Sequence, residues 1–492
     1  MTRWMICACV LVAGGWAATA EAAYRDLMGY PELQALLGSD IPTGAGIIVH
    51  HVEAGTVYAP PPAEGEFKTP DKHFSYESGP TGDSSHANHV GINFYGNDTS
   101  IAPDLGVTAA NPIRNYQVNH WLNDGLLNAG GPAPHTTDAR IGLHAWVAST
   151  GDAGTDGQLL RRFDYTVDHD DFVQIVGIPN GDTSGDGPLL KSAYNDIAVG
   201  RTDAFHKAGT PAVDGIYDDN RVAPTLVAVG LSKNDSERQT SYAAAQVAAG
   251  AALLMEAARN PALSNGTYTN RTRTIHHAEA SEVTRALLMA GADRHVINAR
   301  GGSITTYTAD TNDNLSSTYG AGQMNIHNSY RMLAAGEQDS TQDGGPADVQ
   351  RLGWDYDPSF GAPSGSNATA SYFIEAGDTA HTLIASLVWN IDVIDVGTTS
   401  FIPAADLRNL DLRLIDVTAG GTVEADSLST EHNSENIWFE NIIPGHRYEL
   451  RVTDGGSHSG DYAIAWHMIP EPATVGVLSM LSLTLIRRRR RR

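Results

Sequence analysis

Short apolar runs alternate with helically spaced segments over residues 44–335. The apolar runs are rich in Val and Ile and end in glycine or polar residues, which predicts buried strands at 46–55, 140–149, 171–181 and 196–200. Apolar residues at helical spacing predict helices at 157–170 and 281–293. Strands that alternate with helices favour an α/β fold built on a doubly wound parallel sheet.

The pattern changes from about residue 356 onward, where short apolar and alternating runs are separated by turn sequences such as "DGGSHSGD". This texture predicts a C-terminal all-β sandwich over residues 356–468. Large aromatic side chains usually fill such a core, so three tryptophans are expected there: Trp389, Trp438 and Trp466. The Gly/Ser/Asp-rich segment 336–355 predicts a linker, which leaves residues 24–335 as the first domain.

Residues 1–23 have the organisation of a secretory signal peptide, because Arg3 is followed by an apolar stretch and then by the small residues "ATAEAA". Both cysteines of the chain, Cys7 and Cys9, lie within this segment. The mature chain is therefore expected to lack thiols, which excludes cysteine catalysis and cysteine-bound metal. A lipid anchor at Cys9 is an alternative, although "ICAC" fits a lipoprotein box poorly.

Residues 469–492 contain an apolar run from Ala473 to Ile486, followed by six arginines. As a helix this run would span roughly 21 Å, less than the ~30 Å hydrocarbon core of a bilayer. A short tail anchor is one interpretation. The Pro-Glu-Pro start, apolar run and basic end together resemble a PEP-CTERM sorting signal. That resemblance implies processing by an exosortase, and an exported protein of the cell envelope or exterior in a Gram-negative-type bacterium.

The chain is strongly acidic, with a formal net charge of −25 from 57 acidic and 32 basic residues. Binding to nucleic acid phosphates needs clustered Lys and Arg, so this balance argues against a nucleic-acid partner. The basic run Arg487–Arg492 lies at the extreme C-terminus. Membrane contact is therefore expected only through the sorting tail.

The first candidate for chemistry is Ser241, in the run "QTSYAAAQVAAGAALL" at 239–254. This run carries no charge until Glu256, which predicts a buried helix that begins near the serine. In one interpretation the serine only caps the helix. In the other it is a nucleophile, whose own N–H at the positive helix end would face a developing oxyanion.

Three further segments supply the groups that a serine nucleophile needs. "SSHANHVGI" places His86 and His89 on one helical face, as a base or as a metal-binding pair; no third ligand is evident, so zinc is not expected. Glu53 ends the first predicted strand, where α/β sheets place their sites, although a surface charge is the alternative. Asn180 follows a strand in a glycine-rich loop, as an oxyanion donor or a simple turn residue.

Taken in chain order, six blocks over roughly residues 40–335 resemble the subtilisin-like serine proteases, or subtilases: "GAGIIVHHVEAG", "SSHANHVGI", "VGIPNGDTSG", "SAYNDIAVG", "RVAPTLVAVG" and "QTSYAAAQVAAGAALL". The resemblance implies a subtilisin-like fold and a serine endopeptidase acting on proteins or peptides. It also implies a triad of Ser241, His86 and Glu53, with Asn180 in the oxyanion hole. Subtilases often bind structural calcium, and the Asp/Asn-rich loops would allow it, although no loop has a recognisable ligand spacing.

Several departures from the family pattern favour a second interpretation, an inactive subtilase-like surface binding or structural protein. Glu53 stands where the family has Asp, and Gln239 and Ala245 replace a Gly and a Pro. Val147 could narrow or block the first specificity pocket, and about 20 residues before the first strand are too few for the usual prodomain. A lipase or esterase would need a Gly-x-Ser-x-Gly elbow, which is absent around Ser241. The sandwich loosely resembles modules of secreted bacterial proteases, with binding and stabilising roles both open.

Overall fold

The computed structural model describes residues 24–470 apart from short segments at 182–184, 186, 220, 234–236, 299–301, 362–367, 397–399, 404–407 and 456–458. The predicted signal peptide and the greater part of the predicted sorting signal lie outside the described residues. Within the described part of the chain, no helix combines the length and apolar character needed to cross a bilayer.

The N-terminal region is built on one seven-stranded sheet with the order β2-β3-β1-β4-β5-β6-β7. Every neighbouring pair in it is parallel. The strands are short and mostly buried: β1 (Val49–Glu53), β2 (Phe74–Tyr76), β3 (Ile113–Gln117), β4 (Ile141–His144), β5 (Val173–Gly177), β6 (Ile197–Arg201) and β7 (Leu226–Ala228). The parallel α/β sheet predicted from the alternating pattern is therefore confirmed.

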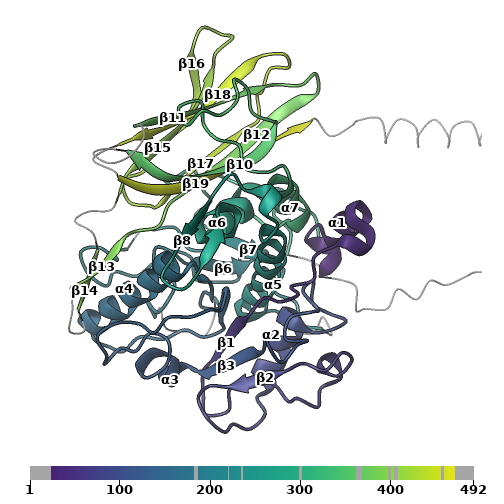
Figure 1. Cartoon of the computed structure of the whole chain (residues 1–492), viewed down its shortest axis with the longest axis vertical. Coiled ribbons are helices and arrows are strands. Elements are labelled where there is room, and N and C mark those ends of the chain that lie inside the picture. Colours follow the sequence, from purple (N-terminus) through teal and green to yellow (C-terminus); the bar gives the residue numbers. More distant parts are fainter. Residues whose placement is uncertain are drawn as a thin grey trace, which may run out of the picture.

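Helices cover both faces of this sheet (Figure 1). The helices whose apolar residues join the larger core are α1 (Tyr30–Leu37), α2 (Ser85–Tyr95), α5 (Thr240–Ala258), α6 (Ser281–Gly291) and α7 (Ile326–Ala334). On the opposite face lie α3 (Val118–Asn123) and α4 (Ala153–Asp170). Seventeen of the 19 residues of α5 are buried, which explains why this helix has no polar face.

Shorter elements complete the region. They are the hairpin β8 (Thr267–Thr269) and β9 (Thr274–His276), and the 3₁₀ turns η2 (Arg25–Leu27), η3 (Gly38–Asp40), η4 (Gly65–Phe67), η5 (Pro261–Leu263) and η6 (His277–Glu279).

The C-terminal region contains two four-stranded antiparallel sheets, which confirms the predicted all-β sandwich. One sheet has the order β10 (Leu352–Gly361), β19 (Ser459–Pro470), β12 (Ala380–Val388), β17 (Ser434–Phe439). The other has the order β11 (Thr369–Glu375), β18 (Arg447–Asp454), β15 (Leu410–Asp416), β16 (Thr422–Ser427).

Two of the three tryptophans expected in the sandwich core are there, and the third is not. Trp389 and Trp466 are fully buried between the sheets. Trp438 is only partly buried and packs edge-on against Tyr307 of the N-terminal region, with ring centroids 5.2 Å apart. Its indole belongs to the contact between the two regions, because its strand lies at the edge of the sheet that faces the helices.

The two regions pack directly against each other. The β10-β19-β12-β17 sheet lies on α6 and α7 (Figure 1), and Trp354 Nε1 donates a hydrogen bond to the Leu333 carbonyl at 3.1 Å. A ribbon of β13 (Val393–Asp395) and β14 (Phe401–Pro403) packs on α4. β10 begins at Leu352, so the segment expected to be a linker includes its first residues.

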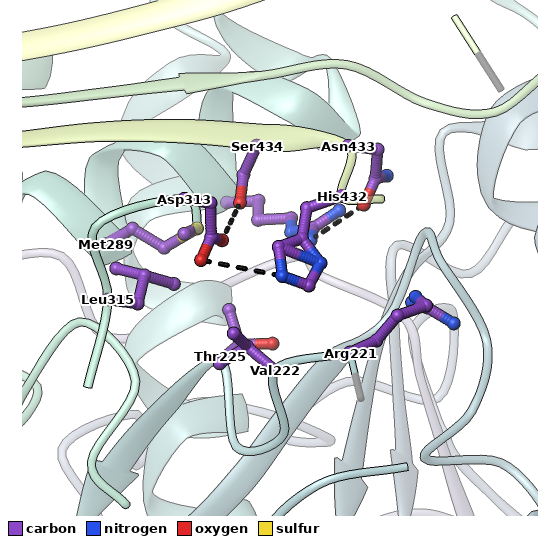
Figure 2. A pocket seen from close by; sticks show the side chains of 10 residues that line it. Arg221, Val222, Thr225, Met289, Asp313, Leu315, His432, Asn433 and Ser434 are labelled. Atoms are coloured by element: carbon purple, nitrogen blue, oxygen red, sulfur yellow. Dashed lines mark hydrogen bonds and ion pairs between the residues drawn. The ribbon is translucent and has the colours of Figure 1, made fainter. Parts of the chain in front are cut away.

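The junction also encloses polar groups, shown in Figure 2. A cavity of about 20 Å³, which is room for one water molecule, lies between the regions. Ser434 Oγ donates to Asp313 Oδ2 at 3.1 Å, and His432 Nε2 lies 3.7 Å from Asp313 Oδ1. The hydrogen bond of Ser434 and the contact of His432 with Asp313 link the sandwich to a loop of the N-terminal region.

Candidate functional site

Glu53 lies at the carboxyl end of β1, in the interior of the sheet between β3 and β4. The next two strands in sequence, β2 and β3, lie on one side of β1, and β4 to β7 lie on the other, so the strand order reverses direction at β1. Such switch points open crevices at the carboxyl edge of a parallel sheet. The side chain is 3 % exposed, so this carboxylate depends on protein partners rather than water.

His86 lies in the first turn of α2, which begins after Ser84, whose Oγ accepts a hydrogen bond from the Ala87 N–H at 3.1 Å. Its Nδ1 is 2.8 Å from Glu53 Oε2. The His86 side chain is 36 % exposed, in contrast to the buried carboxylate. The sequence prediction of an acid and a histidine brought together from distant segments therefore corresponds to a hydrogen-bonded pair in the structure.

Hydrogen bonds and charges around the pair stabilise the anionic form of Glu53 and the protonated form of His86. Burial acts to raise the pKa of Glu53, but hydrogen bonds from His51 and His86 outweigh it and hold the pKa below its ordinary value. Burial acts to lower the pKa of His86, but Glu53, hydrogen bonding to Gln239 and the charge of Glu237 together raise it. Glu53 is thus an anion at neutral pH, and His86 donates to it through Nδ1–H.

A second histidine on the same carboxylate was not anticipated from the sequence. His51 Nε2 is 2.9 Å from Glu53 Oε1, and His51 Nδ1 is 2.9 Å from the Tyr95 hydroxyl. Because a carboxylate only accepts, His51 donates to Glu53 from Nε2–H, and its Nδ1 faces the Tyr95 hydroxyl. Residues two apart on a strand face the same side, so the "HVE" of β1 contained this signal.

Ser241 is the second residue of α5, and it is 8 % exposed. The next residue ties this end of α5 to α2: the Tyr242 hydroxyl lies 3.0 Å from His89 Nδ1, and the Tyr242 ring centroid is 6.3 Å from that of His86. Within the described residues, no hydrogen bond joins Ser241 to His86 or Glu53. The structure therefore brings Tyr242, the residue after Ser241, to His86 and His89, and the catalytic role of Ser241 stays a prediction.

Asn180 follows β5 and meets the same helix end. Its Oδ1 accepts a hydrogen bond from the Thr240 N–H at 3.1 Å, which fixes the plane of the amide next to Ser241. β5 itself approaches closely, because a Cβ added at Gly177 would lie 3.3 Å from the Thr240 carbonyl oxygen. The small residue lets the N-terminus of α5 sit against the carboxyl end of the strand.

A surface depression of about 290 Å³ is lined, among the described residues, by Val147, Ala148, Ser149, Gly185 and Gly187. It combines the segment after β4 with the loop after Asn180. Val147 forms part of its wall, and the expectation that this valine narrows or blocks a specificity pocket stays a prediction.

No protein-family model matches the chain, and the search of curated proteins found no match. Among solved structures, the chain is similar to tripeptidyl peptidase 2, at 12 % identity over 78 % of this chain and a TM-score of 0.28; it spans 40 % of that protein's length. It is also similar to the pre-peptidase C-terminal domain of a collagenase from Bacillus anthracis, at 16 % identity over 24 % of this chain and 91 % of that domain, with a TM-score of 0.18.

Proposed function

We propose that the protein is an exported serine endopeptidase that hydrolyses peptide bonds through Ser241, His86 and Glu53, with Asn180 in its oxyanion hole. The observation that carries the proposal is the 2.8 Å hydrogen bond between His86 Nδ1 and the buried Glu53 carboxylate. Because Nδ1 carries the proton of this bond, Nε2 is the basic nitrogen of His86, on an imidazole ring that is partly exposed. The contacts of Tyr242 and Asn180 support the placement of Ser241 beside that nitrogen.

In this mechanism the Ser241 hydroxyl attacks the substrate carbonyl carbon while His86 Nε2 takes its proton. Glu53 stabilises the imidazolium that forms and holds the ring in the required tautomer. The Asn180 amide and the Ser241 N–H donate to the tetrahedral oxyanion. His86 then protonates the leaving amine, and water hydrolyses the acyl-enzyme by the same steps in reverse.

The depression near Val147 is the place proposed for a substrate side chain. The depression lined by Val147 and Gly187 would take an apolar side chain of a protein or peptide next to the scissile bond. The predicted signal peptide and sorting tail support export, exosortase processing and membrane contact only through the tail. The full chain has a formal net charge of −25, and an acidic protein suits neutral or basic polypeptide substrates better than acidic ones.

The test is hydrolysis of an unfolded protein by the purified mature chain. Ser241→Ala should lower turnover by at least about 10⁴-fold, and Asn180→Ala by about 100- to 1,000-fold. Ser39→Ala, at an exposed serine of η3, is the matched control and should leave turnover unchanged. Full activity in folded Ser241→Ala would refute the assignment.

A second candidate is a subtilase-like binding protein without hydrolytic activity. Two observations favour it: no hydrogen bond joins Ser241 to His86 within the described residues, and the side chain of Gln239 interacts with the imidazole. In this case a peptide would bind the depression and dissociate intact. Peptide binding by the mature chain without cleavage, unaltered in Ser241→Ala, would identify this function.

A further inference from the structure

A group of carboxylates lines one cavity at the junction of the two regions, away from Ser241 and His86. The cavity has a volume of about 300 Å³. Its acidic residues are Glu337, Asp339, Asp343, Asp355 and Asp357, and we call it the acidic cavity. None of its described lining residues is a lysine or arginine.

Three of these carboxylates are spaced for a shared ion. One oxygen from each of Glu337, Asp339 and Asp355 lies within 4.8 Å of the other two. Calcium binds oxygen at about 2.3–2.6 Å, so two ligands of one ion lie up to about twice that distance apart. Residues two apart on a strand share a face, so β10 directs Asp355 and Asp357 to the same side.

The protein's own donors satisfy only part of this cluster. Glu337 accepts from the Asn265 N–H and pairs with His277 Nδ1 at 2.7 Å. Asp355 accepts from the Tyr372 hydroxyl at 2.6 Å through Oδ2. These bonds hold the two carboxylates in place. Both side chains are buried, since Glu337 is 8 % and Asp355 is 2 % exposed.

Asp357 supplies the independent sign of a ligand. It is 4 % exposed, and its Oδ1 accepts from the Ser359 N–H at 2.9 Å. Its Oδ2 is buried and has no hydrogen-bond partner in the described structure. A buried carboxylate oxygen without a donor is costly, and a cation is a partner that it could share with the other carboxylates of the lining.

We infer that the acidic cavity binds a calcium ion, held by carboxylate oxygens of the 337–339 segment and of β10. Calcium is preferred over magnesium because it accepts six to eight oxygen ligands in irregular geometry, whereas magnesium needs a compact octahedron. Glu337 is bonded to Asn265 and His277 of the N-terminal region, and Asp355 and Asp357 belong to the sandwich. The ion would therefore fasten the sandwich to the N-terminal region.

The test is calcium binding to the chelator-treated mature chain, by calorimetry and by displacement of Tb³⁺ whose luminescence Tyr356 sensitises. Saturable binding at about 0.1–1 mM or tighter is expected, with magnesium weaker. Asp339→Asn/Asp357→Asn should bind at least tenfold more weakly. Glu375→Gln/Asp378→Asn removes two exposed carboxylates of the same sandwich and should bind as the unaltered chain does.

Three outcomes would overturn the inference: no binding up to about 10 mM calcium, equal affinity in the folded Asp339→Asn/Asp357→Asn variant, or tighter binding of magnesium. If that double variant does not fold, Asp357→Asn alone replaces it, because it keeps the Ser359 hydrogen bond through an amide oxygen. None of these readouts depends on hydrolysis, so failure of the proposed peptidase activity would leave the result interpretable.

Discussion

Glu53 and the acidic cavity show the same kind of side chain in two opposite electrostatic states. Burial acts to raise the pKa of Glu53, Asp355 and Asp357 alike. Glu53 has two imidazole partners, and its pKa falls; Asp355 and Asp357 face other carboxylates, and theirs rise. Burial is the largest cause of the raised pKa of Asp355 and Asp357, and only at Glu53 do hydrogen-bonding partners reverse its effect. The carboxylate of Glu53 is paired with two imidazoles, whereas none of the described residues that line the acidic cavity is a lysine or arginine.

The largest expected effect is at the Glu53 site. Glu53→Gln keeps the size of the side chain but cannot remain an anion, and its amide can hold His86 in the wrong tautomer. We expect kcat to fall by about 10⁴-fold. Peptide hydrolysis measures this, with Glu375→Gln as the control for charge at an exposed position. A Glu53→Gln enzyme within tenfold of the unaltered one would show that the carboxylate has no part in turnover.

The pH dependence of kcat/KM tests whether Glu53 raises the pKa of His86. Activity needs neutral His86, and its raised pKa means that kcat/KM should fall as pH drops through a value above the ordinary 6.5. Glu53→Gln removes the main cause of that rise, so the acidic limb of any residual activity should move to lower pH. An unmoved limb would mean that another group controls it.

A smaller effect is expected at His51, which acts on Glu53 as a positioning residue. His51→Ala removes one hydrogen bond to a charged group, about 1.5–3 kcal/mol, or roughly 10- to 200-fold in kcat. The pKa of Glu53 should rise, so the loss should be greatest at acidic pH. His51→Gln, which can still donate to Glu53, should recover part of the rate. Equal losses in both variants at every pH would indicate a purely structural role.

The last prediction concerns stability at the acidic cavity. There a substitution should stabilise the fold, whereas the substitutions at the Glu53 site should lower activity. The pKa of Asp357 is about 6 in the folded chain and about 3.9 when unfolded. Ionisation of Asp357 is therefore less favourable in the folded chain, so the free energy of unfolding falls as pH rises from about 4 to 6. In chelator at pH 7, Asp357→Asn should raise the free energy of unfolding by on the order of 2 kcal/mol, and by nothing near pH 4. Urea unfolding at pH 7 and near pH 4 measures these two differences. With saturating calcium at pH 7, the unaltered chain should instead be more stable than Asp357→Asn.

Much of this arrangement could be predicted because it is encoded locally. The Val/Ile-rich runs and the charge-free helix around Ser241 are patterns of buried α/β elements. The order of the six blocks along the chain then predicted that Glu53, His86 and Asn180 lie at the same edge of the sheet. The hydrogen bond of Glu53 to His86, and of Asn180 to the end of α5, is consistent with that expectation.

What the sequence did not indicate depends on contacts between distant segments. His51 needed the partner Tyr95 on α2 to become part of the site. The position of Trp438 depended on which face of the sandwich meets the helices, and no local pattern specifies that face. The acidic cavity joins Asn265, a segment predicted as a linker, and β10, so its ligands have no regular spacing.

The most direct measurement is labelling of the mature protein with a fluorophosphonate, which reacts with an activated serine. We predict a covalent adduct on Ser241, detected by peptide mass spectrometry, that is retained in Ser39→Ala and lost in folded His86→Ala and Glu53→Gln. Absence of label from the folded, unaltered chain, or an adduct on Ser241 that persists in His86→Ala, would contradict it.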